Sequence, residues 1–529
     1  MVEITSTPII ITILLGTIGL LIPVVDAIRK EKTGKNKNKL YSAITFGTLI
    51  IAILIVIVRI FTGESIPAFD LTQEGVLSDD MFGSFFAVSL LIVSILVSAS
   101  SWNYVRGIAN TASYYSLILL SSIGMVLIAY STDFVMLFIA WELMSIPTYA
   151  LAAYAKRDPI SNESAIKYFM FGALSSSLLV LAIGFTYVVT GTTNISESIS
   201  ILANLEEGFV PVSILAIGLF VAGFGFKMGL VPFHMWLPDT YEGSPTTIGA
   251  LLAAGTKKAG FAAAIKVVVI GTFALGNDWG LILGILAVVT MTVGNLAALR
   301  QKSVTRILAY SSIAQAGYIL IGLAVAPYSD IALDGSLFHI LNHAVMKSGG
   351  FLAVAAIAIA ISSYSLEKYT GLGRRMPITA IAFAIALLAL AGVPPLNGFW
   401  SKLVIFESAI DSGAVIPWGP YLAIFGVLNS ALSLGYYLWI IRKMYLDDPV
   451  DKSRLKEPKA ILGVLIFTVI FMVGFGIWHA PLLEFASSSS ISLNEISAML
   501  NMNQNTVSNI EPEINTESQI NNNNNNKDT

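Results

Sequence analysis

Long apolar segments dominate this chain, and ionisable side chains interrupt several of them. A helix that crosses a bilayer needs about 20 mainly apolar residues, and a charge at its centre costs roughly 2.5 to 3.5 kcal/mol. Because 55% of the 529 residues are hydrophobic and only 12% are charged, the composition exceeds what a soluble core requires. The sequence therefore predicts an all-α integral membrane protein. The ionisable residues inside its apolar segments are Glu142, Lys227, Lys257, Lys258, Lys266, Lys347 and Lys402.

Counting the apolar segments predicts about fourteen transmembrane helices. The first is followed by a basic stretch, unlike a cleavable signal peptide, and is expected to remain as a helix. The segments lie near residues 8–28, 41–61, 82–99, 112–130, 134–154, 165–190, 211–231, 245–272, 281–299, 305–326, 335–361, 377–411, 419–443 and 460–478.

The basic residues predict how these segments are oriented. Of the 30 Lys and Arg residues, 22 lie in or beside alternate connections between the segments. Since such residues concentrate in cytoplasmic loops, a multi-pass protein of the cell membrane is expected, with both termini outside. The connection 232–244 has no Lys or Arg and is assigned to the cytoplasm by alternation alone. The connections expected outside, which also lack basic residues, are 62–81, 191–210, 273–280, 327–334 and 412–418.

Two of the segments contain helix-breaking residues. The seventh runs through Gly223, Gly225 and Gly229 into Pro232, and the twelfth contains the sequence GVPPLNGF at 392–399. Broken helices at membrane depth persist only where the freed backbone faces protein or water. The breaks lie five segments apart, each near a lysine, which predicts an internal repeat of five helices.

This repeat divides the chain into predicted regions. A three-helix region is expected over 1–110, and a C-terminal helix over 444–486. An Asn-rich polar tail over 487–529 is expected to be disordered, because such sequence cannot bury a core. The two five-helix repeats are expected over 111–272 and 273–443.

The residue inventory also limits cofactor chemistry. With no cysteine, the chain offers no ligands for an iron–sulfur cluster, a thiolate-bound zinc or a covalently attached haem. His339 and His343 lie one turn apart on one helix, so they cannot hold a haem iron from both sides. No cofactor or metal is therefore expected on this chain, and any redox centre is expected in a partner.

The buried charged residues suggest a path for ions. Glu142 and Lys227 are expected to pair, because opposite charges stabilise each other when buried; a static, purely structural ion pair is the alternative. Adjacent helical residues point about 100 degrees apart, so Lys257 rather than Lys258 is expected to face a hydrated axis. Lys266 lies nearer the outer end, where it either faces the interior or snorkels to the interface.

A third set of candidates recurs at four-residue spacing. His339, His343 and Lys347 share one helix face, which predicts a proton-conducting stripe. A zinc site is a second interpretation, weakened by the lack of a third ligand. Histidines that only hydrogen-bond to a neighbouring helix are the third.

Several motifs together resemble the antiporter-like membrane subunits of respiratory complex I. The resemblance covers roughly residues 110 to 410, and the loop and AIKYF segments are most similar to subunit N. By contrast, NHAVMKSGG at 342–350 is closer to subunits L and M or to sodium/proton antiporters. The motifs are AIKYF at 165–169, GTTN at 191–194, PFHMWLPDTYEGSPT at 232–246, RILAYSSIAQAGY at 306–318 and GVPPLNGF at 392–399.

The resemblance implies a fourteen-helix fold with two inverted repeats and a role for each buried residue. Glu142 and Lys227 match the family's coupled pair, Lys257 its central lysine, and Lys402 the terminal lysine of the second half-channel. The implied function is proton translocation driven by quinone reduction, with the quinone and the redox centres in partner subunits.

The expected partners are other membrane subunits, the bilayer and protons, and no nucleic acid. The alternatives are a subunit of a multi-subunit cation/proton antiporter or membrane-bound hydrogenase, and a non-conducting scaffold.

Overall fold

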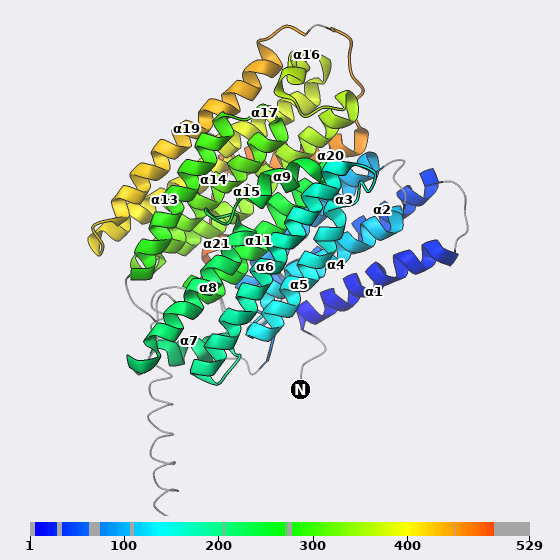
Figure 1. Cartoon of the computed structure of the whole chain (residues 1–529). Helices are drawn as coiled ribbons and strands as arrows, with labels where there is room; N and C mark the ends of the chain where they lie inside the picture. Colours follow the sequence, from blue (N-terminus) through cyan, green and yellow to red (C-terminus); the bar gives the residue numbers. More distant parts are fainter. Residues whose placement is uncertain are drawn as a thin grey trace, which may run out of the picture.

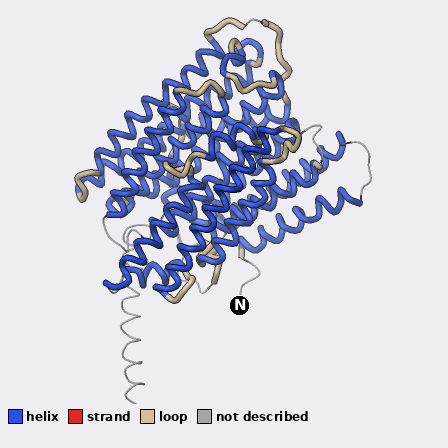
Figure 2. Tube along the Cα trace, in the orientation of Figure 1, coloured by secondary structure: helices blue, strands red, loops and turns tan. Residues whose placement is uncertain are grey.

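The computed structural model describes most of the chain and is almost entirely helical (Figures 1 and 2). Its described residues contain isolated β-bridges but no strand. Thirteen of their helices are long and apolar enough to cross a membrane. The expected all-helical membrane fold is thus confirmed. The described residues are 6–28, 34–62, 75–105, 110–203, 205, 207–269, 271, 278–449 and 451–490.

Each predicted apolar segment coincides with helix in this structure. The N-terminal helices are α1 (Thr7–Ile28), α2 (Gly34–Thr62) and α3 (Met81–Tyr104). The region of the first predicted repeat contains α4 (Thr111–Tyr130), α5 (Phe134–Ala152), α6 (Pro159–Thr190), α7 (Ile195–Ala203), η1 (Glu207–Phe209), α8 (Val210–Met228), α9 (Trp236–Gly243), α10 (Thr246–Ala250), η2 (Leu251–Thr256), α11 (Lys257–Ala264) and η3 (Ile265–Val269).

The remaining helices belong to the second predicted repeat and the C-terminal region. They are α13 (Asp278–Leu299), α14 (Val304–Val325), η4 (Ala326–Tyr328), α15 (Ala332–Ile361), η5 (Leu366–Tyr369), α16 (Leu372–Arg375), α17 (Pro377–Ala391), α18 (Asn397–Asp411), η6 (Ser412–Ala414), α19 (Gly419–Tyr445), α20 (Lys459–Ile477) and α21 (Ala480–Ser487). Of the predicted polar tail, only the residues up to 490 are described, so the expectation for the rest of it lies outside the described residues.

Several long helices begin at an aspartate that caps the first turn. The Asp133 carboxylate accepts hydrogen bonds from two backbone N–H groups of α5, and Asp158 caps α6 with Pro159 at its first position. These contacts satisfy N–H groups that a helix start leaves without partners. At the other end of α6, Gly191 adopts φ 71°, a left-handed conformation that suits glycine.

The seventh predicted segment breaks at Gly229. Gly223 and Gly225 remain inside α8, and Gly229 then caps the helix with φ 68°. A Cβ atom on Gly223 would lie 2.6 Å from Leu179 Cδ2, so this glycine permits close packing of α6 on α8. The chain resumes helix in the short, buried α9.

The twelfth predicted segment is two separate helices, and its break has the same layout. α17 ends at Ala391, Gly392 caps it with φ 86°, and α18 begins at Asn397. At fifteen residues each, α17 and α18 are shorter than the other spans. Both breaks thus combine a left-handed glycine, a proline-containing turn and a nearby lysine, the layout that two related repeats would require.

The eighth predicted segment is buried throughout Thr246–Val268, and its helix has π-helical turns at two places. The π-helical turn η2 precedes α11, and a second π-helical turn, η3, follows it. Such turns are rare, hold an extra residue and change the direction of the side chains that follow, frequently at functional sites. Here they flank the helix that begins with Lys257 and Lys258.

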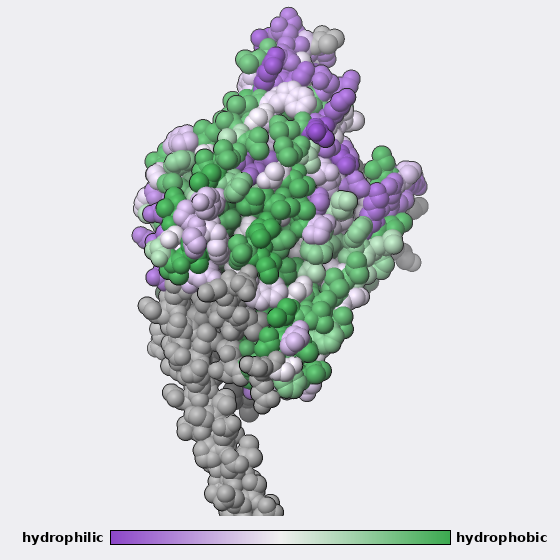
Figure 3. Space-filling view, turned by 60° about the vertical axis from the view of Figure 1, so that its left-hand side comes forward, coloured by the Kyte–Doolittle hydropathy of each residue, from purple (hydrophilic) through white to green (hydrophobic). Residues whose placement is uncertain are grey.

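The outer surface separates into an apolar side and a polar end. In Figure 3 hydrophobic residues cover much of the visible face, while hydrophilic residues gather at the upper end, where Figure 1 places α16. Ion pairs at that end join Arg374 to Asp448 and Arg375 to Asp451. An apolar belt with a basic, ion-paired end is the surface expected of a helix bundle in a bilayer.

Candidate functional site

The last turn of α8 buries Lys227 between α5 and α6. Only 2% of the residue is exposed, and its Nζ atom donates to Ser145 Oγ at 3.0 Å and Tyr168 Oη at 2.9 Å. Aromatic rings surround the same ammonium group, with centroids 5.9 Å away for Trp141, 5.7 Å for Tyr149 and 5.1 Å for Tyr168. Ring faces attract cations, so this box stabilises a charged lysine without a carboxylate.

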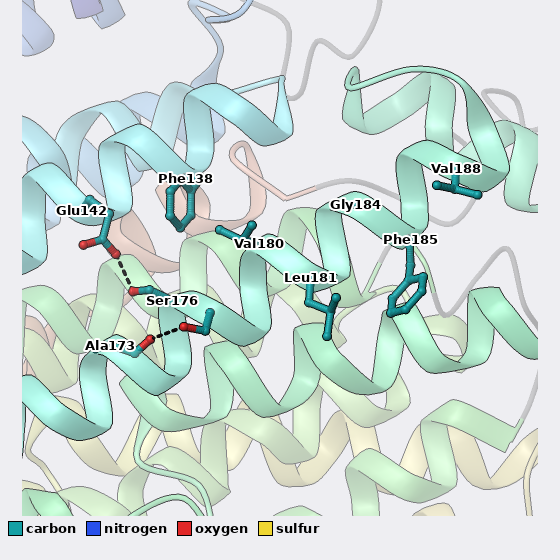
Figure 4. Close-up of a pocket in the computed structure, with 10 residues that line it drawn as sticks. Phe138, Glu142, Ala173, Ser176, Val180, Leu181, Gly184, Phe185 and Val188 are labelled. Carbon is teal, nitrogen blue, oxygen red and sulfur yellow. Dashed lines mark hydrogen bonds between the residues drawn. The ribbon is translucent and has the colours of Figure 1, made fainter.

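Glu142 lies on α5 three residues before Ser145 and seven before Tyr149, so it shares a helix face with these two residues of the box. It accepts a hydrogen bond from Ser176 at one end of an open groove of about 790 Å³ between α5 and α6 (Figure 4). Among the described residues, no ion pair joins it to Lys227. The expected direct ion pair is therefore not formed in this structure, where the Glu142 carboxylate accepts from Ser176 of α6 instead.

Lys257 and Lys347 meet at neighbouring serines of α14. The Lys257 Nζ atom lies 2.7 Å from the Ser312 carbonyl oxygen and 3.3 Å from its Oγ. The Lys347 Nζ atom donates to Ser311 Oγ at 2.5 Å, and this hydroxyl lies 2.7 Å from Tyr437 Oη. Lysines from the two predicted repeats thus contact adjacent residues of one helix.

Gly229 makes room for the first of these lysines. A Cβ atom on this glycine would lie 3.1 Å from Lys257 Nζ and 2.7 Å from Leu237 Cδ1. Its left-handed backbone also disfavours any other residue. The helix break and the position of Lys257 are therefore coupled.

Lys402 lies beside the second helix break, as Lys257 lies beside the first. Its Nζ atom donates to the carbonyl oxygens of Leu390 at 3.0 Å and Ala391 at 3.2 Å, and to Ser430 Oγ at 3.0 Å. The Tyr318 ring centroid lies 4.5 Å from the same atom. A cation at the carbonyl end of α17 is favourable, because unpaired carbonyl groups carry partial negative charge there.

His339 lies between Ser401, the residue before Lys402, and Gln315 of α14. Its Nδ1 atom lies 2.8 Å from Ser401 Oγ, and its Nε2 atom 3.0 Å from Gln315 Oε1. The Gln315 amide nitrogen donates to the Leu390 carbonyl, which also accepts from Lys402. Both nitrogens of His339 are therefore occupied, and the described residues contain no cluster of three or more His, Cys, Asp or Glu side chains for a metal ion.

His343 differs from the other members of the predicted stripe. Its ring lies 5.9 Å from that of His339, but neither of its nitrogens has a hydrogen-bond partner within the described part of the chain. The stripe predicted from the sequence thus lies on one buried face, with hydrogen bonds at His339 and Lys347 only.

The other two lysines of the eighth segment have contrasting surroundings. Lys258 is fully buried, and its Nζ atom has no hydrogen-bond partner among the described residues. Lys266 is 1% exposed and donates to the backbone oxygens of Ala129 at 2.6 Å and Ser131 at 2.9 Å. Of the two alternatives for Lys266, the structure shows the interior position, because the carbonyl end of α4 provides it with acceptors inside the bundle.

Comparison with known proteins identifies the family. The model of the NADH:quinone oxidoreductase/Mrp antiporter transmembrane family matches residues 131–433. The chain belongs to this family. Subunit N of the F(420)H(2) dehydrogenase of Methanosarcina mazei is 40% identical over 475 residues, covering 87% of this chain and 94% of the relative. Subunit N of the NADH-quinone oxidoreductase of Chlorobium chlorochromatii is 38% identical, covering 78% and 81%.

Solved structures of membrane complexes are also similar to this chain. A chain of the membrane-bound sulfane sulfur reductase, an archaeal respiratory membrane complex, matches with a TM-score of 0.80 at 27% identity, covering 93% of this chain and 99% of that one. A chain of respiratory complex I from Thermus thermophilus matches at 0.74 and 26%, covering 90% and 99%. The Mrp complex of Dietzia shares the fold, at 0.81 and 21% with 94% and 100% covered. The resemblance found in the motifs is confirmed.

One polar cluster was not predicted as a site. Asp239 on α9 pairs with Lys167 at 2.8 Å and with Arg306 at 2.9 Å, and Arg306 also pairs with Glu242 at 3.1 Å. Burial alone would raise the pKa of Asp239, but the hydrogen bonds from Lys167 and Arg306 outweigh it and hold that pKa below its usual range. The cluster fastens the half-helix α9 to α6 and α14.

The serines and the glutamine of α14 were also missed as functional residues. Ser311, Ser312 and Gln315 all lie within the motif RILAYSSIAQAGY that carried the family resemblance. That motif was the available signal, but nothing in it tells which lysines the serines contact.

Proposed function

We propose that this chain is a proton-translocating membrane subunit, similar to subunit N, of a complex I-type quinone oxidoreductase, and that it holds no redox cofactor. The family match and the relatives named subunit N support this proposal. The observation that carries it is the meeting of Lys257 and Lys347 at Ser312 and Ser311. A path between the two predicted half-channels would cross at this point.

Hydroxyl groups and neutral imidazole can both donate and accept a hydrogen bond, so they can pass a proton onward. In the proposed path Lys227 exchanges protons through Tyr168 and Ser145, and Lys257 passes its proton by way of the serines to Lys347. The Ser311 hydroxyl also contacts Tyr437, which lies beside Gln315.

From there, Gln315 orients His339, and the proton reaches Lys402 and leaves past Ser430. His339 and His343 are proposed to carry protons in this second half.

Glu142 is proposed to link the relay to the rest of the complex. Its groove is lined mostly by apolar side chains of α5 and α6. A carboxylate exposed to lipid there would be costly, so another membrane subunit is proposed to shield it. A change of charge in that neighbour, caused by quinone reduction, would act on Glu142 and, through α5, on Lys227. The quinone and the redox centres are proposed to lie in partner subunits.

The proposed setting is the cell membrane, with both termini outside. The hydrophilic end near α16, with its Arg–Asp pairs, then faces the cytoplasm. This assignment rests on the distribution of Lys and Arg in the connections.

A cation/proton antiporter subunit working without electron transfer is the second candidate. The fold shared with the Mrp complex and the His339, His343 and Lys347 stripe favour it. Proteoliposomes holding the whole complex separate the two candidates. An imposed sodium gradient that moves protons without an electron donor supports the antiporter, and proton movement only during quinone reduction supports the first proposal.

The test of the main proposal is Lys257→Met in the assembled complex. Inside-out membrane vesicles are supplied with NADH or reduced F420, and proton uptake and quinone reduction are recorded together. Because Met cannot carry a proton, uptake should fall at least about 100-fold while the complex still assembles. The exposed Lys156→Met variant is the control, and uptake at the parental rate in Lys257→Met would favour a non-conducting scaffold.

A further inference from the structure

The connection between α19 and α20 contacts the rest of the protein through alternate residues. Its described residues are 446–449 and 451–458, drawn in orange beside α16 in Figure 1. Residues 451–458 form no helix, and the alternation is that of an extended segment, whose successive side chains point to opposite sides. The contacts are Pro449 with Gly371, Asp451 and the Ser453 carbonyl oxygen with the Arg375 side chain, the Leu455 N–H with the Arg375 carbonyl oxygen, and Glu457 with the first turn of α17.

The basic residues of this connection occupy the other positions. Lys452, Arg454 and Lys456 alternate with the contact residues and are exposed, as is Lys459 at the start of α20. Among the described residues, no ion pair involves any of these four. They are therefore available to an anion outside the chain.

The acidic residues of the same connection are neutralised within the protein. Glu457 accepts hydrogen bonds from the N–H and the hydroxyl of Thr379 at the start of α17. The other three acids form ion pairs, Asp447 with Lys443 at 3.1 Å, Asp448 with Arg374 at 2.7 Å and Asp451 with Arg375 at 3.4 Å. A solvated loop usually mixes both signs of charge on its surface. Here the outward side carries four positive charges that no acid of the connection neutralises.

The helix that follows these cations exposes one apolar face. Between 45% and 71% of each large side chain on this face is exposed, and a Cβ atom on Gly463 would meet nothing within 4 Å. Residues three, four, seven and eight positions apart lie on one side of a helix, so the exposed positions form a continuous stripe that begins at a cation. After Lys459, these positions are Gly463, Ile466, Phe467, Ile470, Gly474 and Ile477.

We propose that this surface binds an anionic lipid, with the acidic headgroup at Lys456 and Lys459 and a hydrocarbon chain along the exposed face of α20. Each Lys or Arg near an anionic membrane surface strengthens the attraction by about fivefold. Lys452 and Arg454, earlier in the same connection, extend the positive field that the headgroup meets. This inference goes beyond the proposed function and does not depend on the proton path.

A lipid fits this surface better than a helix of another subunit does. Helices that pack closely in membranes bring small residues to the contact. On this face Ile466, Phe467 and Ile470 stand between the two glycines and hold a neighbouring helix away. A soluble acidic protein would meet the cations but leave the apolar stripe uncovered. An anionic head joined to an apolar chain matches both parts.

The experiment uses the assembled complex in phosphatidylcholine vesicles that contain a small fraction of a photoactivatable lipid. One preparation contains phosphatidylglycerol with a diazirine in its acyl chain, and the other contains phosphatidylcholine with the same group. After illumination, mass spectrometry of peptides measures the label on residues 460–477. In the parental complex, the phosphatidylglycerol probe should label this segment at least about fivefold more than the phosphatidylcholine probe does.

Paired variants identify the residues that select the headgroup. Lys456→Gln/Lys459→Gln should bring the ratio of the two labels close to one, whereas Lys456→Arg/Lys459→Arg should keep the parental ratio because it keeps both charges. The matched control is Lys156→Gln/Arg157→Gln, which neutralises two exposed bases between α5 and α6. This control should also keep the parental ratio.

Three results would overturn the proposal. Equal labelling of α20 by the two probes in the parental complex would show that the surface does not select an anionic headgroup. Absence of label from either probe would show that another subunit covers this face. A parental ratio in Lys456→Gln/Lys459→Gln would assign the selectivity to other residues.

If that double variant does not assemble, Lys456→Gln alone is judged by the same criterion, with a ratio below the parental one expected. None of these measurements records proton uptake. Failure of the lipid site and failure of the proposed function are therefore distinguishable.

Discussion

Lys227 and Lys402 are both buried beside a broken helix, but their surroundings hold a positive charge in different ways. Lys227 donates to two hydroxyl groups inside an aromatic box, whereas Lys402 donates mainly to the backbone carbonyl groups at the end of α17. Carbonyl oxygens accept hydrogen bonds but have no proton to pass on, while hydroxyl groups do both. The first arrangement therefore suits proton exchange, and the second suits holding a proton until Ser430 offers an exit.

The largest expected effect comes from neutralising either lysine. Lys227→Met and Lys402→Met should each reduce proton uptake by vesicles at least about 100-fold, because each removes a proton carrier from the only proposed path. Both variants should still insert, since Met fills similar apolar space. Uptake at the parental rate in proteoliposomes containing either variant would remove that lysine from the relay.

The same contrast separates Lys347, which contacts a hydroxyl, from Lys266, which contacts carbonyl groups. Lys347→Ala should impair proton uptake much more than Lys266→Ala. Loss of Lys266 leaves buried carbonyl oxygens at the end of α4 unpaired, at a cost of about 1 to 3 kcal/mol, so it should lower thermal stability instead. Uptake and melting temperature are measured on the same preparations. The proposed relay through α15 is wrong if both variants pump normally or only Lys266→Ala fails.

The two tyrosines near these lysines sharpen the comparison. Tyr168→Phe keeps the ring but removes the hydroxyl to which Lys227 donates, and should lower proton uptake about tenfold. Tyr318→Phe keeps the ring face over Lys402, and should change uptake by no more than about twofold. Equal losses in the two variants would mean that the hydroxyl of Tyr168 has no special part in proton exchange.

The smallest expected effect is at the Asp239 cluster. The pKa of this carboxyl is lowered in the folded protein, so its pairing stabilises the protein above the unfolded-state pKa and is lost as the pH falls through the folded-state pKa. Asp239→Asn should therefore lower the melting temperature by a few degrees at most near neutral pH, and by less in acid. If the difference in melting temperature between Asp239→Asn and the parent instead grew as the pH fell, this explanation would be contradicted.

Most of the fold could be predicted from the sequence, because hydropathy alone decides which segments can cross a bilayer. The break at Gly392 was also predictable, since glycine and proline leave backbone groups without helical partners. The residue at which the first break begins could not be predicted. Gly223, Gly225 and Gly229 are the same residue type, and only Gly229 adopts a left-handed conformation.

The buried lysines were predictable as functional candidates, but most of their contacts were not. Lys257 meets Ser312 and Lys227 meets Ser145 across large separations in sequence, through the packing of distant helices. The acceptors of Lys266 are backbone oxygens, which any residue carries, so no residue type could indicate them.

The central claim is that protons cross between the two halves at the serines of α14, and replacement of Ser311 tests it most directly. Ser311→Ala removes the hydroxyl between Lys347 and Tyr437, whereas Ser311→Thr retains one. Proton uptake by vesicles holding the assembled complex should fall at least about tenfold in the alanine variant and stay near the parental rate in the threonine variant. Parental uptake in Ser311→Ala would contradict the crossing at this helix.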